Sequence, residues 1–204
     1  MKYKLYDNAF APSPRRVRMF MAEKGLTYER VAIDIAAGET QGAEFQGVNA
    51  LGEVPVLELE DGTRLTESLA ICRYLEDEHP EPCLLGSSAL ERAHIDSWVL
   101  RLMFRAYVPS TQAFRHGHKF WADKITQIPS YAELAKLHAL EEWQRLDSHL
   151  QQNKYVAGER FSFADIVAFT SLEFGKPSGI RIGAEQAHLR RWHTEIAARP
   201  SAAA

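Results

Sequence analysis

The chain has 204 residues, a formal net charge of -3 and a sequence pI of about 6.2. Hydrophobic residues make up 46% and charged residues 25%, which is ordinary for a globular protein and excludes a compositionally disordered chain. The acidic balance provides no basic stripe for nucleic acid or an anionic membrane, and no apolar run approaches the ~20 residues of a membrane span.

The first third of the chain alternates strand-like and helix-like segments. Lys2 to Tyr6 and Tyr28 to Asp34 are predicted strands. Between them, Ser13 followed by Pro14 opens a predicted helix that stops at Gly25. This order of strand, helix and strand is typical of a parallel βαβ unit.

A hairpin and a further helix follow. Val54 to Leu59 and Thr63 to Thr66 are extended runs separated by an Asp61-Gly62 pair, which is a strong hairpin signal. The next helix is expected to face inward with Ile71, Tyr74 and Leu75. A βαβ half followed by a ββα half predicts a thioredoxin-like domain over residues 1–79.

The remainder of the chain has a helical period. Residues 80–88 are rich in proline and glycine and are expected to link the first domain to an all-helical bundle over residues 89–204. Pro109 and Pro129 are expected to kink or end helices. Two amphipathic helices are expected. The apolar face of the first is Ile95, Trp98, Val99 and Leu102, and that of the second is Leu137, Leu140, Trp143, Leu146 and Leu150. The fold class is therefore α+β.

Residues 161–166 have the pattern of a helix N-terminus. Ser162 and Asp165 have the spacing of a capping box, with Phe161 and Ile166 placed as a hydrophobic staple. We expect a buried helix from Ser162 to about Phe174.

Two cysteines and scattered histidines offer no metal set. Cys72 and Cys83 form no paired-cysteine motif, and His116 and His118 point to different sides of a helix. Two isolated thiols indicate a reducing compartment. Because the first residues also lack a secretion signal, we expect a cytoplasmic protein.

Three motifs carry a family resemblance. They are Gly52 to Leu57, Thr66 to Ile71, and Ser13 to Arg18. Together with Ser162 to Asp165, they make the chain resemble glutathione transferases of the bacterial cytosolic type. The resemblance implies glutathione as a cosubstrate, no prosthetic group, a small hydrophobic electrophile, disulfide or peroxide as second substrate, and a homodimer.

The resemblance also implies a glutathione site. In the family a cis peptide precedes the proline that matches Pro55, and the residue matching Val54 pairs with the cysteinyl unit of the ligand as an added strand. Ser68, at a helix N-terminus, would receive the γ-glutamyl carboxylate, and Glu67 would pair with the ammonium. The alternative is that Glu67 and Ser68 form a plain helix cap.

The remaining contacts are less specific. Gln41, Thr40 and Asn49 are candidate partners for the glycine carboxylate of glutathione. An acceptor pocket would involve the loop from Ala9 to Pro12 and the first long helix. The candidates on that helix are Arg105, Tyr107, Phe114 and His116.

Several residues are candidates for the group that activates the thiol of glutathione. Ser13 is the catalytic candidate, since a hydroxyl at a helix N-terminus favours a thiolate; its rival role is helix N-cap. The family's activating position in serine-type and cysteine-type members falls on Ala11, which removes one expected hydroxyl. Tyr6 is a further candidate, although the tyrosine of other members falls on Asp7, and a strand-packing role suits Tyr6 better.

Three functions follow from these readings. The leading one is conjugation of glutathione to an electrophile, with thiol and disulfide exchange or peroxide reduction at the same site as a variant. In that variant the sulfur is that of glutathione, because Cys72 is expected to be buried in mid-helix. The alternatives are a non-catalytic module that binds glutathione or a protein partner, and a scaffold that only shares the fold.

Overall fold

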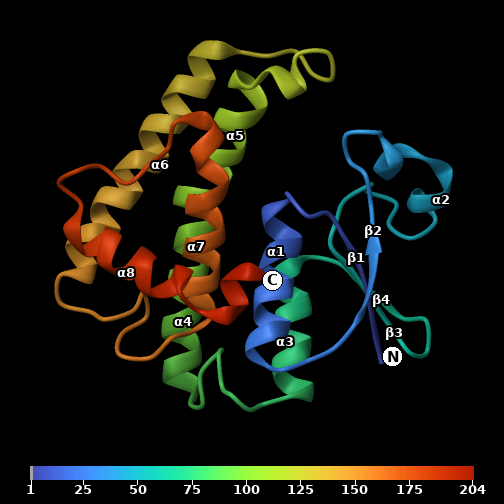
Figure 1. Cartoon of the computed structure of the whole chain (residues 1–204), viewed down its shortest axis with the longest axis horizontal. Coiled ribbons are helices and arrows are strands. Elements are labelled where there is room, and N and C mark those ends of the chain that lie inside the picture. Colours follow the sequence, from blue (N-terminus) through green and yellow to red (C-terminus); the bar gives the residue numbers. More distant parts are fainter. Residues whose placement is uncertain (1) are drawn as a thin grey trace. The chain divides into compact units, whose positions relative to one another are not determined.

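A computed structural model describes residues 2–204, which form two compact units (Figure 1). The first unit runs to Cys83 and also contains Pro200–Ala204, and the second is Leu84–Arg199. The division falls inside the connector expected at residues 80–88, whereas the last residues join the first unit and not the helical one. No helix of the described residues is both long enough and apolar enough to span a membrane.

The first unit is built on a four-stranded sheet in the order β2-β1-β3-β4. Its strands are β1 (Tyr3–Asp7), β2 (Glu29–Ala32), β3 (Val56–Leu59) and β4 (Arg64–Leu65). β1 runs parallel to β2, with Leu5 opposite Arg30, and antiparallel to β3, with Leu5 opposite Leu57. This mixed sheet confirms the thioredoxin-like domain predicted from the order of the elements.

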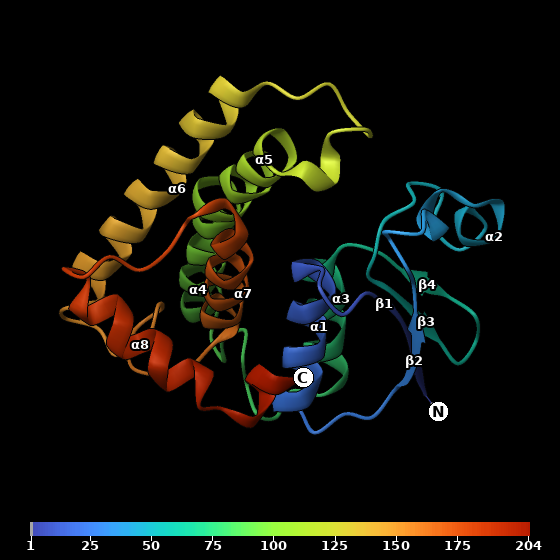
Figure 2. The same ribbon diagram turned by 45° about the horizontal axis from the view of Figure 1, so that its top comes forward.

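Three α-helices complete the first unit: α1 (Pro12–Glu23), α2 (Ala43–Gln46) and α3 (Ser68–Glu78). α1 and α3 lie side by side against one face of the sheet (Figures 1 and 2). Ile71 and Leu75 of α3 are fully buried, as predicted. Tyr74 is only half-buried, because it is turned about 100° from Leu75 on the helix, and the fully buried Cys72 lies on the inward stripe.

The second unit is a helical bundle. Its α-helices are α4 (Ala89–Leu102), α5 (Val108–Gly117), α6 (Pro129–Leu150), α7 (Phe163–Gly175) and α8 (Ala187–Ala197). α7 is the most buried helix and packs against α4, α5 and α8. This arrangement confirms the all-helical second domain.

The start of α7 is the predicted capping box. Ser162 is the N-cap, and the carboxylate Oδ2 of Asp165 accepts from the Ser162 N–H at 2.9 Å. The other oxygen of Asp165 accepts from the Val156 N–H at 2.9 Å and from the Trp192 indole N–H at 2.8 Å. Burial raises the pKa of Asp165 to about 6, although these hydrogen bonds act in the opposite direction. One carboxylate thus joins the start of α7 to a loop and to α8.

Pro109 and Pro129 lie at helix starts and not at helix ends. Pro109 is the second residue of α5, which continues directly from α4 through a π-helical turn at Met103–Tyr107. The wider turn accommodates a residue that has no N–H to donate, and the Ser110 hydroxyl donates to the Ala106 carbonyl at 2.7 Å. Pro129 is the first residue of α6, where its missing N–H has no helical partner to lose.

The buried face of α6 differs from the prediction at its N-terminal half. Trp143, Leu146 and Leu150 are buried as expected, but Leu137 is 56% exposed and Leu140 is half-buried. The residues that face inward there are Ala132, Ala135 and Ala139. Small side chains suit this stretch because α6 packs closely along α5.

Candidate functional site

The bond between Val54 and Pro55 is cis, as predicted. Pro55 is buried and Val54 is half-buried. The ladder between β1 and β3 ends at the pair Tyr6 and Val56, so the main chain of Val54 lies beyond it. An extended peptide can add to such a free length of backbone as a further strand.

The loop before Pro55 requires a glycine. Gly52 has φ +63°, and a Cβ there would lie 2.6 Å from the Thr40 carbonyl oxygen and 3.0 Å from the Gln41 Nε2. The structure therefore brings Gln41 next to the segment that leads to Val54. Asn49 holds the same loop, since its amide donates to the Glu53 carbonyl at 2.8 Å.

The N-terminus of α3 has an unusual backbone. Glu67, its N-cap, has φ 63° and ψ 110°, and it is the one residue other than glycine with positive φ among residues 2–204. A residue in such a region costs about 1–3 kcal/mol, and strain of this kind clusters at ligand sites. Glu67 is exposed, and Ser68, the first residue of the helix, is buried.

Ser68 and Ser13 are joined by a residue that sequence reasoning missed. The Nη1 of Arg16 donates to the Ser68 Oγ at 3.1 Å and to the Ser13 Oγ at 3.4 Å. Arg16 is 1% exposed. The position of Arg16 in the Ser13 to Arg18 motif was the only signal for a role at the site. Its burial could not be predicted, because Arg15 and Arg18 near it are the same residue type.

The N-cap of α1 lies two positions before the N-cap that the sequence suggested. Ala11 is the N-cap and Pro12 is the first helical residue, so Ser13 is the second residue of the helix and not its cap. The rival role of Ser13 as N-cap is therefore wrong. Pro12 suits the first helical position, because its missing N–H has no helical partner to lose there. Pro12 is buried, and its predicted acceptor contact stays a prediction.

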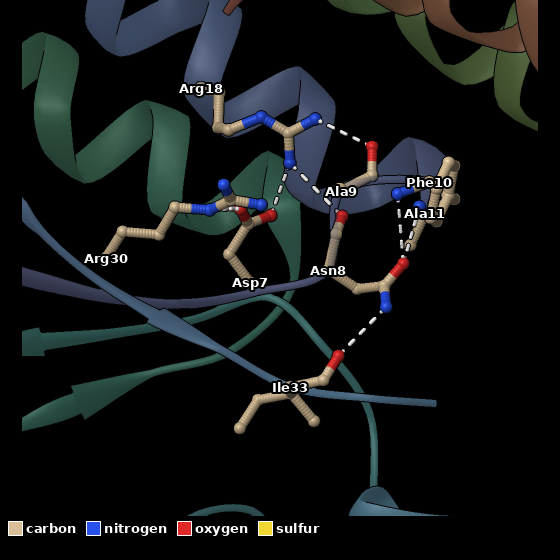
Figure 3. Close-up of polar contacts among 8 residues, drawn as sticks. All are labelled: Asp7, Asn8, Ala9, Phe10, Ala11, Arg18, Arg30 and Ile33. Carbon is tan, nitrogen blue, oxygen red and sulfur yellow. Dashed lines mark hydrogen bonds and ion pairs between the residues drawn. The ribbon is translucent and has the colours of Figure 1, made fainter. Parts of the chain in front are cut away.

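The loop between β1 and α1 is ordered by Asn8. The side-chain oxygen of Asn8 accepts from the N–H groups of Phe10 at 3.0 Å and Ala11 at 3.1 Å (Figure 3). The side-chain amide donates to the Ile33 carbonyl at 2.9 Å. One residue thus fixes the turn that leads into α1.

A buried ion pair holds the same loop from the other side. Asp7 is fully buried and pairs with both Arg18 and Arg30 (Figure 3). Arg18 is itself 6% exposed and also donates to the carbonyls of Asn8 and Ala9, each at 3.2 Å. Asp7, the position to which the family tyrosine maps, therefore has a structural partner set.

Tyr6 packs within the strands. Its hydroxyl donates to Glu58 at 3.0 Å. Its ring packs edge-on against that of Phe45, with 6.2 Å between the ring centroids. Burial, together with the hydrogen bond to Glu58, raises the pKa of Tyr6. These contacts agree with a strand-packing role.

Cys72 is fully buried on α3, as predicted. Burial raises the pKa of its thiol well above the usual value, so its thiolate is disfavoured. Cys72 is therefore poorly suited to act as a reactive thiol.

Two of the predicted acceptor residues, Tyr107 and Phe114, contact the same aromatic ring in the second unit. The ring of Phe174 lies 6.3 Å from that of Tyr107 and 5.3 Å from that of Phe114. Arg105 is exposed on the π-helical turn, and His116 accepts from the Ile128 N–H through Nδ1 at 3.2 Å.

Comparison with known proteins gives the family. The profile described as "Glutathione S-transferase, N-terminal domain" matches residues 10–78, and "Glutathione S-transferase, C-terminal domain" matches residues 130–200. "Glutathione S-transferase 2" of Saccharomyces cerevisiae is 32% identical over 98% of this chain and 89% of its own length. The chain belongs to the glutathione S-transferase family. Its predicted membership and its predicted class of enzyme, a glutathione transferase, are confirmed.

Solved structures agree with this assignment to the transferase family. A glutathione S-transferase domain-containing protein of Marinobacter aquaeolei is 35% identical, with a TM-score of 0.92 over 97% of this chain and 98% of its own. A class Gtt2 glutathione S-transferase of Vibrio parahaemolyticus is 33% identical, with a TM-score of 0.85 over 97% of this transferase and 94% of its own chain. The thioredoxin-like and helical domains are the two domains of the family fold.

Proposed function

We propose that this transferase conjugates glutathione to a hydrophobic electrophile, with the glutathione held entirely by the first unit. The observation that carries the proposal is the strained Glu67 beside Ser68 at the start of α3, within the same unit as the free Val54 backbone. Catalysis then consists of orienting the peptide and stabilising its thiolate, and little proton transfer is needed.

Each part of glutathione has a proposed partner. The main chain of Val54 pairs with the cysteinyl unit next to Pro55, and Ser68 receives the γ-glutamyl carboxylate. Exposed Glu67 pairs with the ammonium. Gln41, which lies against Gly52, is the better candidate for the glycine carboxylate, since the amide of Asn49 already holds the loop.

Removing the carboxylate receptor should weaken binding. Ser68→Ala is expected to raise the Kd for glutathione about 10- to 100-fold, because a hydrogen bond to a charged group contributes about 1.5–3 kcal/mol. Glu67→Gln is expected to raise it about fivefold, since an exposed ion pair contributes up to about 1 kcal/mol. Isothermal titration calorimetry measures both. Glu60→Gln, an equal charge change on the β3–β4 turn, is the control and should leave the Kd unchanged.

Ser13 is the proposed thiol-activating residue. It is the second residue of α1, where its hydroxyl and the helix N-terminus favour an anionic sulfur. Ser13→Ala is expected to lower the thiolate fraction of bound glutathione at neutral pH about tenfold. The thiolate absorbance of the complex, followed against pH, reports this directly. An unchanged profile would assign the activation to the helix N-terminus alone.

Catalysis and binding are separable by assay. Turnover with chloronitrobenzene supports conjugation, and turnover with a small disulfide supports exchange. Tight glutathione binding without either turnover would instead support a non-catalytic binding module. Failure to bind a glutathione resin would leave only a shared fold.

The acceptor is proposed to be apolar and aromatic. The rings of Tyr107 and Phe114 form its contact surface in the second unit, with Arg105 exposed nearby in sequence. We also propose a two-fold homodimer, which the resemblance to the family implies, and a cytoplasmic location, which the two isolated thiols support.

A further inference from the structure

One buried guanidinium connects the starts of the two helices that carry the proposed glutathione contacts. The Nη1 of Arg16 is 3.1 Å from the Ser68 Oγ and 3.4 Å from the Ser13 Oγ. Ser13 is the second residue of α1 and Ser68 the first residue of α3. The same cation therefore contacts the two serines assigned to the sulfur and to the γ-glutamyl carboxylate.

The chemistry of these groups fixes the direction of the hydroxyl hydrogens. A guanidinium has only donors, whereas a serine hydroxyl has one donor and two acceptor lone pairs. An oxygen that accepts from Arg16 must turn its own hydrogen toward another group. A nearby cation also polarises the O–H bond and makes it a stronger donor. Both hydroxyls are thus prepared to donate to anions.

We propose that Arg16 is a positioning residue that sets Ser13 as a hydrogen-bond donor to the glutathione sulfur and Ser68 as a donor to the γ-glutamyl carboxylate. This inference rests on the proposed function, because the two anions are those of glutathione. Arg16 acts through the serines, and one substitution should therefore change both affinity and thiol ionisation.

The surroundings of Arg16 offer a competing structural role. The charge of Arg16 lowers the pKa of Cys72 on α3, in opposition to burial. The negative charge of Glu76 raises that pKa. Glu76 pairs with Lys24, the C-cap residue of α1, at 2.5 Å. If Arg16 only balanced this charge and tied α1 to α3, its loss would lower stability without changing how bound glutathione ionises.

Arg16→Lys separates these roles because it keeps the buried charge and removes the planar guanidinium that places Nη1 within reach of both serines. We expect the thiolate absorbance of bound glutathione to move to higher pH, with the thiolate fraction at neutral pH lowered about tenfold, and the Kd to rise about tenfold. Arg16→Met should move both further. Arg15→Lys is the matched control, since Arg15 donates to the Ala202 carbonyl at 2.9 Å instead. Thermal unfolding of each variant reports stability separately.

The double variant Ser13→Ala with Arg16→Lys tests the route. If Arg16 acts through Ser13, the double variant has the same pH profile as Ser13→Ala alone. Additive shifts, or an Arg16→Lys profile and Kd equal to those of the wild type, would overturn the inference while leaving glutathione binding intact. Absence of glutathione binding by the wild type would overturn the proposed function as well.

Discussion

Asp7→Ala is expected to lower the free energy of unfolding by about 3–5 kcal/mol, because it leaves Arg18 buried without its counter-charge. Arg18 is 6% exposed and cannot move its guanidinium into water without releasing the carbonyls of Asn8 and Ala9. Urea unfolding measures the loss. Asp7→Asn, which keeps the shape but not the charge, should also be destabilising, because Arg18 still lacks its counter-charge.

The matched control for this pair is Arg30→Gln. The Arg30 side chain is 46% exposed, so its ion pair with Asp7 should contribute less than about 1 kcal/mol. The loop itself supplies a second readout: amide exchange at Phe10 and Ala11 should accelerate in Asp7→Ala. Equal stability losses in Asp7→Ala and Arg30→Gln would contradict the assigned role of Arg18.

Asp165→Ala is expected to cost the second unit about 3–5 kcal/mol. The substitution removes the acceptor of three buried N–H groups, those of Val156, Ser162 and the Trp192 indole. Ser162→Ala, which removes only the capping hydroxyl, should cost about 1 kcal/mol. Chemical unfolding followed by tryptophan fluorescence compares the two, and similar losses would refute the central role of Asp165.

The same carboxyl group should give stability a defined pH dependence. Burial raises the pKa of Asp165 to about 6, above the ~3.9 of an unfolded aspartate, so the folded state holds the proton more tightly. Its contribution is therefore full below about pH 4 and is lost as the pH rises through 6, by about 3 kcal/mol in total. Asp165→Asn cannot titrate, and the difference between its pH profile and that of the wild type isolates this effect. Parallel profiles would show that Asp165 ionises as it does in the unfolded chain.

Features written in short stretches of sequence were predictable. The Asp61-Gly62 turn has Gly62 at φ +85°, with Asp61 accepting from the Thr63 N–H at 2.8 Å. The capping box at Ser162 and Asp165 is formed as predicted. Each of these depends on residues within a few positions of one another, where turn and cap chemistry is decisive.

Features that depend on tertiary contacts were not predictable. Arg16 reaches Ser68 across 52 positions, and nothing local distinguishes it from its neighbour Arg15. The sequence shows Asp7 only as the residue at a strand end, and its ion pairs with Arg18 and Arg30 depend on the folded structure. The exposure of Leu137 is set by which face of α6 meets α5, and leucine spacing alone cannot fix that rotation.

The π-helical turn at Met103–Tyr107 determines which side of α5 faces the rest of the bundle. An extra residue in a helical turn rotates all later side chains by about 100° while the axis continues. The side of α5 that carries Phe114 is therefore set independently of the side of α4 that carries Trp98. A single insertion or deletion at this joint would turn the side of α5 that carries Phe114 and leave the preceding helix in its original packing.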